Sequence, residues 1–189
     1  MRTRRQVLVL AAGFPFAFAA SAQDAEGDTR RQMLFERLRN AMTEQEGRLA
    51  EDAVWRFWME AAPSRAVARA VDEAMNARES YDFDRALAIL DGVVSRAPDY
   101  AEGWNQRAFI RFLKDDLDGS LEDIERALEL ESKHFAALAG KAMILMRQGR
   151  VDLGQAALRR AVEIHPWLKE RSMLMPVPGK VTPGPGKDI

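Results

Sequence analysis

Apolar residues recur at intervals of three and four along most of the chain, which is the pattern of amphipathic α-helices. In residues 116–131, for example, the apolar stripe consists of Leu121, Ile124, Ala127 and Leu128. No segment alternates with a period of two, so the sequence gives no support for strands. The pattern therefore predicts an all-α fold.

The helical pattern repeats every 34 residues in the middle of the chain. Shifting the sequence by this distance aligns small or apolar residues in several columns, including Ala74/Ala108/Ala142, Leu90/Ile124/Leu158 and Val93/Ala127/Ala161. Each unit holds two amphipathic stretches joined by a short turn. Because one helix pair cannot bury its apolar stripe alone, the pairs are expected to stack around a continuous core. The period predicts a solenoid of paired helices.

At this spacing the chain resembles the tetratricopeptide repeat family, whose repeat is also 34 residues long. The resemblance rests on Trp104 and Ala108 in one helix, on Ser120, Ile124 and Ala127 in the next, and on residues 97–102, which close one repeat and open another. It implies three repeats, residues 67–100, 101–134 and 135–168. It also implies a right-handed superhelix whose concave face is formed mainly by the first helix of each pair.

The N-terminal residues 1–22 have the composition of a secretory signal peptide. Three arginines precede a 14-residue apolar run from Val7 to Ala20, and Ala20-Ser21-Ala22 is a small-x-small cleavage pattern. The run is shorter than the roughly 20 residues that a membrane-spanning helix needs. We expect cleavage after Ala22 and a periplasmic protein. Residues 3–8 are also similar to a twin-arginine signal, so the Sec and twin-arginine routes both stay open.

Residues 23–66 are expected to form an N-terminal helical cap that precedes the first repeat. One helix is predicted over residues 31–41, and a second starts at the capping box of residues 43–46 and ends near Ala61. The expected apolar face of the second helix is Leu49, Val54, Phe57 and Trp58, with Trp55 beside it. Residues 169–189 are predicted to be a short C-terminal cap followed by a disordered tail rich in proline and glycine.

The composition leaves little material for catalysis. The 189 residues carry 28 basic and 29 acidic side chains, no cysteine and two histidines. Near-balanced charge argues against nucleic-acid binding, and the absence of cysteine excludes disulfides and thiolate chemistry. His134 and His165 are expected at the surface or between repeats rather than on a metal, and Asp116 is expected to be a helix cap rather than a calcium ligand. We expect no enzyme activity, no metal and no cofactor.

The groove that the family resemblance implies is the candidate site. Its side chains are expected to be Val71, Met75, Arg78, Asn105, Gln106, Phe109, Phe112, Met143, Met146 and Arg147. The positions at which some family members hold a peptide carboxylate carry residues unsuited to that role, so no carboxylate clamp is expected. Methionine and phenylalanine form an adaptable apolar floor. The resemblance therefore implies a protein-interaction module, an adaptor or assembly factor, that binds an apolar helix or peptide.

Two alternatives remain open from the sequence. The N-terminal helix with Trp55 and Trp58 is tethered nearby and offers a complementary surface, so it competes with an external partner for the groove. In the first alternative, this helix fills the groove and the chain is a structural homo-oligomer. In the second, less favoured alternative, the chain is an enzyme that uses the groove. Sequence identifies neither the partner nor the oligomeric state.

Overall fold

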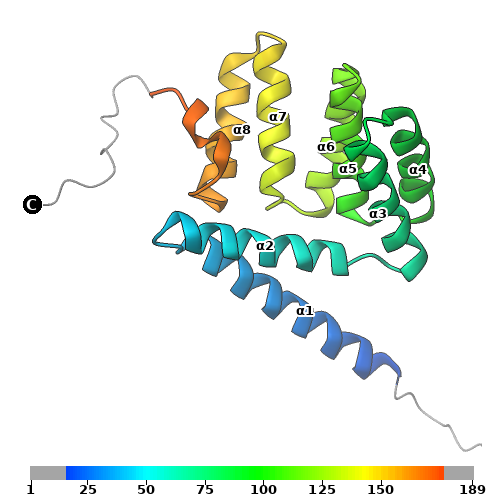
Figure 1. Cartoon of the computed structure of the whole chain (residues 1–189). Coiled ribbons are helices and arrows are strands. Elements are labelled where there is room, and N and C mark those ends of the chain that lie inside the picture. The colour runs from blue at the N-terminus through cyan, green and yellow to red at the C-terminus, as the bar shows by residue number, and fades with distance from the viewer. Residues whose placement is uncertain (1–15, 177–189) are drawn as a thin grey trace, which may run out of the picture.

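The computed structural model describes residues 16–176, with side chains from residue 25, and this part of the chain is helical without strands (Figure 1). The α-helices are α1 (Phe16–Arg39), α2 (Glu44–Glu60), α3 (Arg65–Glu79), α4 (Phe83–Arg96), α5 (Ala101–Leu113), α6 (Leu117–Leu130), α7 (Phe135–Arg147) and α8 (Val151–Ile164), followed by the 3-10 helix η1 (Lys169–Met173). The all-α prediction is confirmed. Residues 1–15 and 177–189, which hold most of the predicted signal peptide and the tail, lie outside the described residues.

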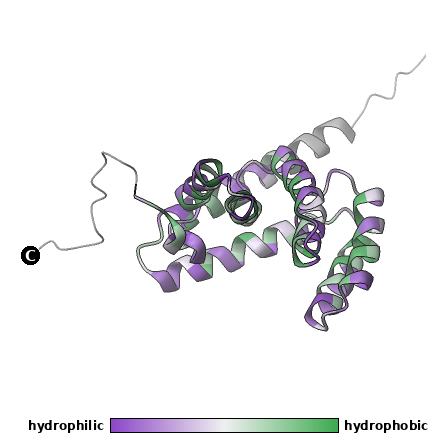
Figure 2. Cartoon of the chain, turned by 90° about the horizontal axis from the view of Figure 1, so that it is seen from above, coloured by the Kyte–Doolittle hydropathy of each residue, from purple (hydrophilic) through white to green (hydrophobic). Residues whose placement is uncertain are grey.

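Each of the three repeats contains one helix pair: α3 with α4, α5 with α6, and α7 with α8. Hydrophobic and hydrophilic residues lie on different sides of the helices (Figure 2), as amphipathic stripes require. The pairs approach closely because small residues stand at their contacts, and Ala74, Ala127, Ala142 and Ala161 are almost fully buried. The Ser120 hydroxyl donates to the Ala108 carbonyl across one pair at 2.7 Å.

The turn inside each repeat has a residue with left-handed backbone conformation at the same repeat position. Tyr81, Asp115 and Gly149 stand 34 residues apart and have φ angles of 61°, 66° and 78°. The residue after each of them donates a backbone hydrogen bond to the carbonyl five residues earlier, at 2.9 Å, from Asp82 to Ala77, from Asp116 to Arg111 and from Arg150 to Leu145. This is the bond of a Schellman motif, and it ends the first helix of every pair. Asp116 then caps α6 by accepting from the Gly119 N–H, as expected.

The N-terminal pair α1–α2 lies across the stacked repeats rather than ahead of the first one. In Figure 1, α2 passes beneath the repeat pairs, with α1 below it. Val54 and Trp58 share a core with Phe135, Leu138 and other residues of the third repeat. Where α2 ends, Met59 and Ala62 pack against the first repeat. The α1–α2 pair therefore bridges the first and third repeats, because the third repeat offers large apolar side chains to the tryptophan.

The buried face of α2 also differs from the expected one. Its buried residues are Gly47, Ala50, Val54 and Trp58, whereas Leu49 is 52% exposed. Gly47 sets this register, because a side-chain carbon added there would lie 2.7 Å from Cβ of Trp167. The N-terminus of α2 is as predicted: the Thr43 hydroxyl accepts from the Glu46 N–H at 3.2 Å. The first helix extends further than expected, since α1 begins at Phe16.

None of the helices within residues 16–176 is both long enough and apolar enough to cross a membrane.

Candidate binding cavity

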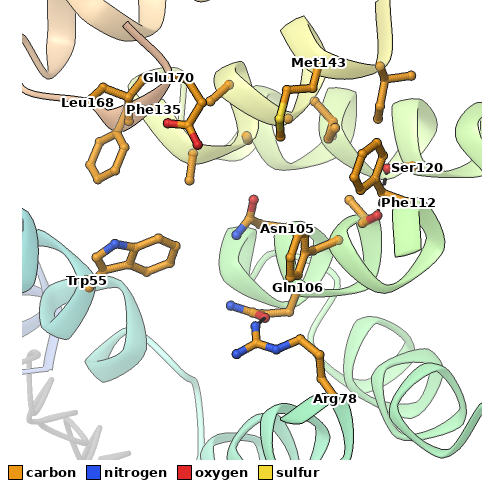
Figure 3. A pocket seen from close by; sticks show the side chains of 18 of the residues that line it. Trp55, Arg78, Asn105, Gln106, Phe112, Ser120, Phe135, Met143, Leu168 and Glu170 are labelled. Carbon is orange, nitrogen blue, oxygen red and sulfur yellow. Dashed lines mark hydrogen bonds between the residues drawn. The ribbon is translucent and has the colours of Figure 1, made fainter. Parts of the chain in front are cut away.

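A cavity of about 290 Å³ lies where α2 faces the first helices of the second and third repeats (Figure 3). Helix α5 contributes Phe109 and Phe112, and α7 contributes Met143, Phe135 and several small residues. The small residues matter because Ala136, Ala139 and Gly140 leave space that larger side chains would fill. Phe109 is 41% exposed, although most aromatic rings among the described side chains are covered. The cavity is thus an open, mainly apolar pocket on the inner side of the repeats.

The two tryptophans of α2 have different roles. Trp58 is 4% exposed and stacks on His134, with ring centroids 3.9 Å apart and planes at 15°. Trp55 is half-buried and forms a wall of the cavity. It meets Trp58 edge-on, with centroids 5.3 Å apart. Helix α2 therefore covers the inner face of the repeats beside His134, while the cavity beside Trp55 stays open.

Six of the ten predicted groove residues line the cavity, namely Arg78, Asn105, Gln106, Phe109, Phe112 and Met143. The other four lie elsewhere. Val71 is fully buried in the core of the first repeat, and Met75 packs against the same core. Met146 packs into the third repeat, and Arg147 forms an ion pair with Asp115 at 2.6 Å. Val71 is unavailable because the end of α2 covers that part of the first repeat.

The cavity also contains residues that the repeat pattern did not select. Glu51 and Trp55 come from α2, Leu168 is the last residue of the third repeat, and Glu170 comes from η1. The position of α2 across the repeats brings Glu51 and Trp55 to the groove. A repeat alignment contains no signal for Glu51, Trp55 and Glu170, because α2 and η1 lie outside the repeats.

A buried polar cluster fixes one wall of the cavity. Glu102 is 1% exposed and accepts hydrogen bonds from the side-chain amides of Asn105 and Gln106. His134 lies 3.0 Å from the same carboxylate through Nε2. Nδ1 of His134 accepts from the Ala137 N–H at 3.3 Å, so Nε2 carries the proton and donates to Glu102. The cluster holds the two cavity-facing amides in fixed positions.

Both histidines are fully buried. Neither lies at the surface: His134 lies where the second repeat meets the third repeat and α2, and His165 lies between the third repeat and α2 rather than between two repeats. His165 lies 3.1 Å from Glu51, which joins the third repeat to α2. No group of three or more potential metal ligands occurs within the described residues. Each histidine contacts a carboxylate of another element, His134 that of Glu102 and His165 that of Glu51.

Charged pairs attach the N-terminal helices to the repeats. The pKa of Glu51 is lowered, chiefly by the hydrogen bond from His165, against the opposing effect of burial. Glu131 accepts two hydrogen bonds from Arg31, one of them from Nε at 2.7 Å. Burial acts to raise the pKa of Glu131, but the bonds from Arg31 and from the Lys133 N–H outweigh it and lower that pKa. Both carboxylates therefore hold α1 and α2 more firmly when ionised.

Opposite charges stand on different sides of the cavity (Figure 3). The Arg78 guanidinium lies 5.5 Å from the Phe109 ring centroid and 3.4 Å from the Gln106 side-chain oxygen. Glu170 stands near Leu168 at the other side. In the part of the chain that the structure describes, neither side chain forms an ion pair. The pocket is therefore apolar in its centre and oppositely charged at its edges.

Comparisons with known proteins show what the chain is similar to. No protein-family model matches the sequence. A protein from Rhizobium etli described as a TPR repeat-containing protein is 42% identical over 81 residues, 43% of this chain and 40% of that protein. Tetratricopeptide repeat protein 36 of Xenopus tropicalis is 30% identical over 98 residues, 49% of this chain and 48% of that protein. The human protein of the same name is 28% identical over 107 residues, 54% and 57% of the two chains. The chain spans about half the length of these curated relatives.

Two solved structures of MamA variants each superpose with a TM-score of 0.49 at 13% sequence identity. They cover 73% and 82% of this chain, and 96% and 89% of their own.

Proposed function

Since this chain is a tetratricopeptide repeat protein, we propose that it works as a non-catalytic module that binds another protein through the cavity between α2, α5 and α7. The partner inserts one or two apolar side chains of a helix or an extended peptide into the pocket. No cofactor takes part. The observation that carries the proposal is the open apolar cavity on the inner side of the repeats.

The size of the cavity suits side chains rather than a whole helix. An engineered cavity of about 150 Å³ in another protein binds one benzene molecule. At about 290 Å³ this cavity has room for roughly two groups of that size, such as one indole or two leucine side chains. Met143 and the exposed Phe109 adjust to different shapes, since methionine is flexible and polarisable. A partner is thus recognised by a short apolar anchor.

The proposed place of action is the periplasm. The support is the N-terminal sequence, with three arginines, an apolar run and the cleavage pattern that ends at Ala22. N-terminal sequencing of the protein recovered from a periplasmic fraction tests this directly. A first residue of Gln23 supports export and cleavage, whereas an intact N-terminus in the cytoplasmic fraction contradicts it.

Capture of a partner tests the binding function. Purified protein is used as bait in periplasmic extract, beside a Phe109→Ala/Met143→Ala variant. Both substitutions lie in the cavity wall, so we expect the captured partner to be lost while the helical circular dichroism is kept. The matched control is Val151→Ala/Leu153→Ala, which removes two exposed apolar side chains from α8. Capture that is equal for all three proteins contradicts binding in the cavity.

A further inference from the structure

From the charges at the cavity edges we infer that the partner segment is dipolar: an apolar anchor flanked by a carboxylate on one side and by a lysine or arginine on the other. The carboxylate faces Arg78 and the cation faces Glu170. This inference rests on the proposed function, and it adds the charge pattern and the orientation of the bound segment.

Arg78 is suited to meet a carboxylate. Its guanidinium is held beside the cavity by the Phe109 ring and by the Gln106 side-chain oxygen. The guanidinium lies over the Phe109 ring and donates one N–H to Gln106, so its other N–H groups are free to bind a carboxylate with two hydrogen bonds. Gln106 is itself fixed by Glu102 from behind. Arg78 is therefore a positioned cation without a carboxylate partner among the described residues.

Glu170 provides the opposite charge. It borders the cavity from η1, and Figure 3 shows its carboxylate on the side away from Arg78. Glu51 lies on the same lining, but it already pairs with His165. The indole of Trp55 also lines this part of the cavity and offers a ring face to a cation. A lysine or arginine of the partner meets both a carboxylate and an aromatic surface here.

The position of these charges makes them selective. An apolar anchor that enters the cavity excludes water from Arg78 and Glu170, both of which are already partly buried. A partner without matching charges leaves them desolvated and unpaired, which weakens its binding. A partner with the charges reversed places like charges together, which weakens it further. The pocket thus distinguishes the order of charges along the segment.

Selection from a random peptide library tests the inference. A displayed library of twelve-residue peptides is selected on the wild-type protein and on an Arg78→Glu/Glu170→Lys variant. We expect wild-type selection to enrich an aromatic or large aliphatic residue with an acidic residue on one side and a basic residue on the other. The charge-swapped variant should enrich the opposite order. The matched control, Arg150→Glu/Glu163→Lys, swaps two exposed charges at the two ends of α8, outside the cavity lining, and should keep the wild-type order.

Titration of one enriched peptide by fluorescence polarisation gives the size of the effect. Replacing either charged residue of the peptide by glutamine should weaken binding by about two- to fivefold, the range of a partly exposed ion pair. The difference should shrink in 0.5 M NaCl. Enriched apolar anchors without a consistent charge order overturn the dipolar pattern and leave the proposed function standing. A selection that enriches no apolar peptide overturns both.

Discussion

Replacing Trp58 by alanine tests whether the N-terminal helices are part of the folded unit. The Trp58 ring stacks on His134 at 3.9 Å and lies 5.0 Å from the Phe135 ring. It also meets Phe35 of α1, with centroids 6.1 Å apart. One side chain therefore joins α1, α2 and the third repeat.

The loss of stability is expected to be large. Trp58 is 4% exposed, and truncation of a buried tryptophan to alanine costs about 3 to 5 kcal/mol. In a domain of this size 1 kcal/mol corresponds to about 2 to 4 °C in melting temperature, so the melting temperature should fall by about 10 °C. Trp58→Phe should cost much less, because the indole N–H has no hydrogen-bond partner among the described residues and its removal relieves an unsatisfied donor.

Urea unfolding followed by circular dichroism measures these free energies. The control is Trp55→Ala on the same helix, three residues away. Trp55 is only half-buried and lines the cavity, so its loss should cost about 1 kcal/mol of stability or less but should weaken peptide binding. If Trp58→Ala lowers the free energy of unfolding by less than about 1 kcal/mol, the packing of α1 and α2 on the third repeat is not a stabilising contact.

Further predictions concern the turns, the helix cap and the response to acid. Tyr81→Gly should stabilise the protein by about 0.5 to 1 kcal/mol, because glycine adopts the left-handed conformation without the steric cost of a side chain. Gly149→Ala at the equivalent turn should destabilise it by about 1 kcal/mol. Melting temperatures that shift in the same direction for both variants contradict the shared turn geometry. Thr43→Ala removes the cap of α2 and should cost about 1 kcal/mol in urea unfolding, and an unchanged midpoint contradicts its role. A lowered pKa of Glu131 means stability that is fully present above its ordinary pKa of 4.5 and is lost as the pH falls through the lowered value. The melting temperature of Glu131→Gln should therefore fall less steeply between pH 5 and pH 3 than that of the wild type or of the exposed control Glu163→Gln, and parallel curves contradict the assignment.

The parts of the fold that could be predicted are those that depend on neighbouring residues. The helices follow from apolar periodicity, and the cap at Asp116 follows from residue type and spacing. The left-handed residue at Tyr81 was harder to predict, because a bulky side chain is uncommon there and only the 34-residue alignment with Gly149 points to it.

The position of the N-terminal helices could not be predicted in the same way. It depends on contacts between residues far apart in sequence, such as Glu51 with His165 and Arg31 with Glu131. A repeat pattern contains no information on them. Of the residues predicted for the groove, Phe109 and Phe112 of α5 line the cavity, whereas Val71 lies in the core of the first repeat beneath the end of α2.

Photo-crosslinking from the cavity tests the central claim most directly. A photoreactive phenylalanine analogue is placed at position 109 in the cavity, and separately at position 153 on the exposed face of α8, and cells that express each protein are irradiated. Binding in the cavity predicts a discrete covalent adduct with another protein from position 109, lost when Met143 is replaced by glutamate, and no such adduct from position 153. Equal labelling from both positions, or no protein adduct from position 109, would contradict it.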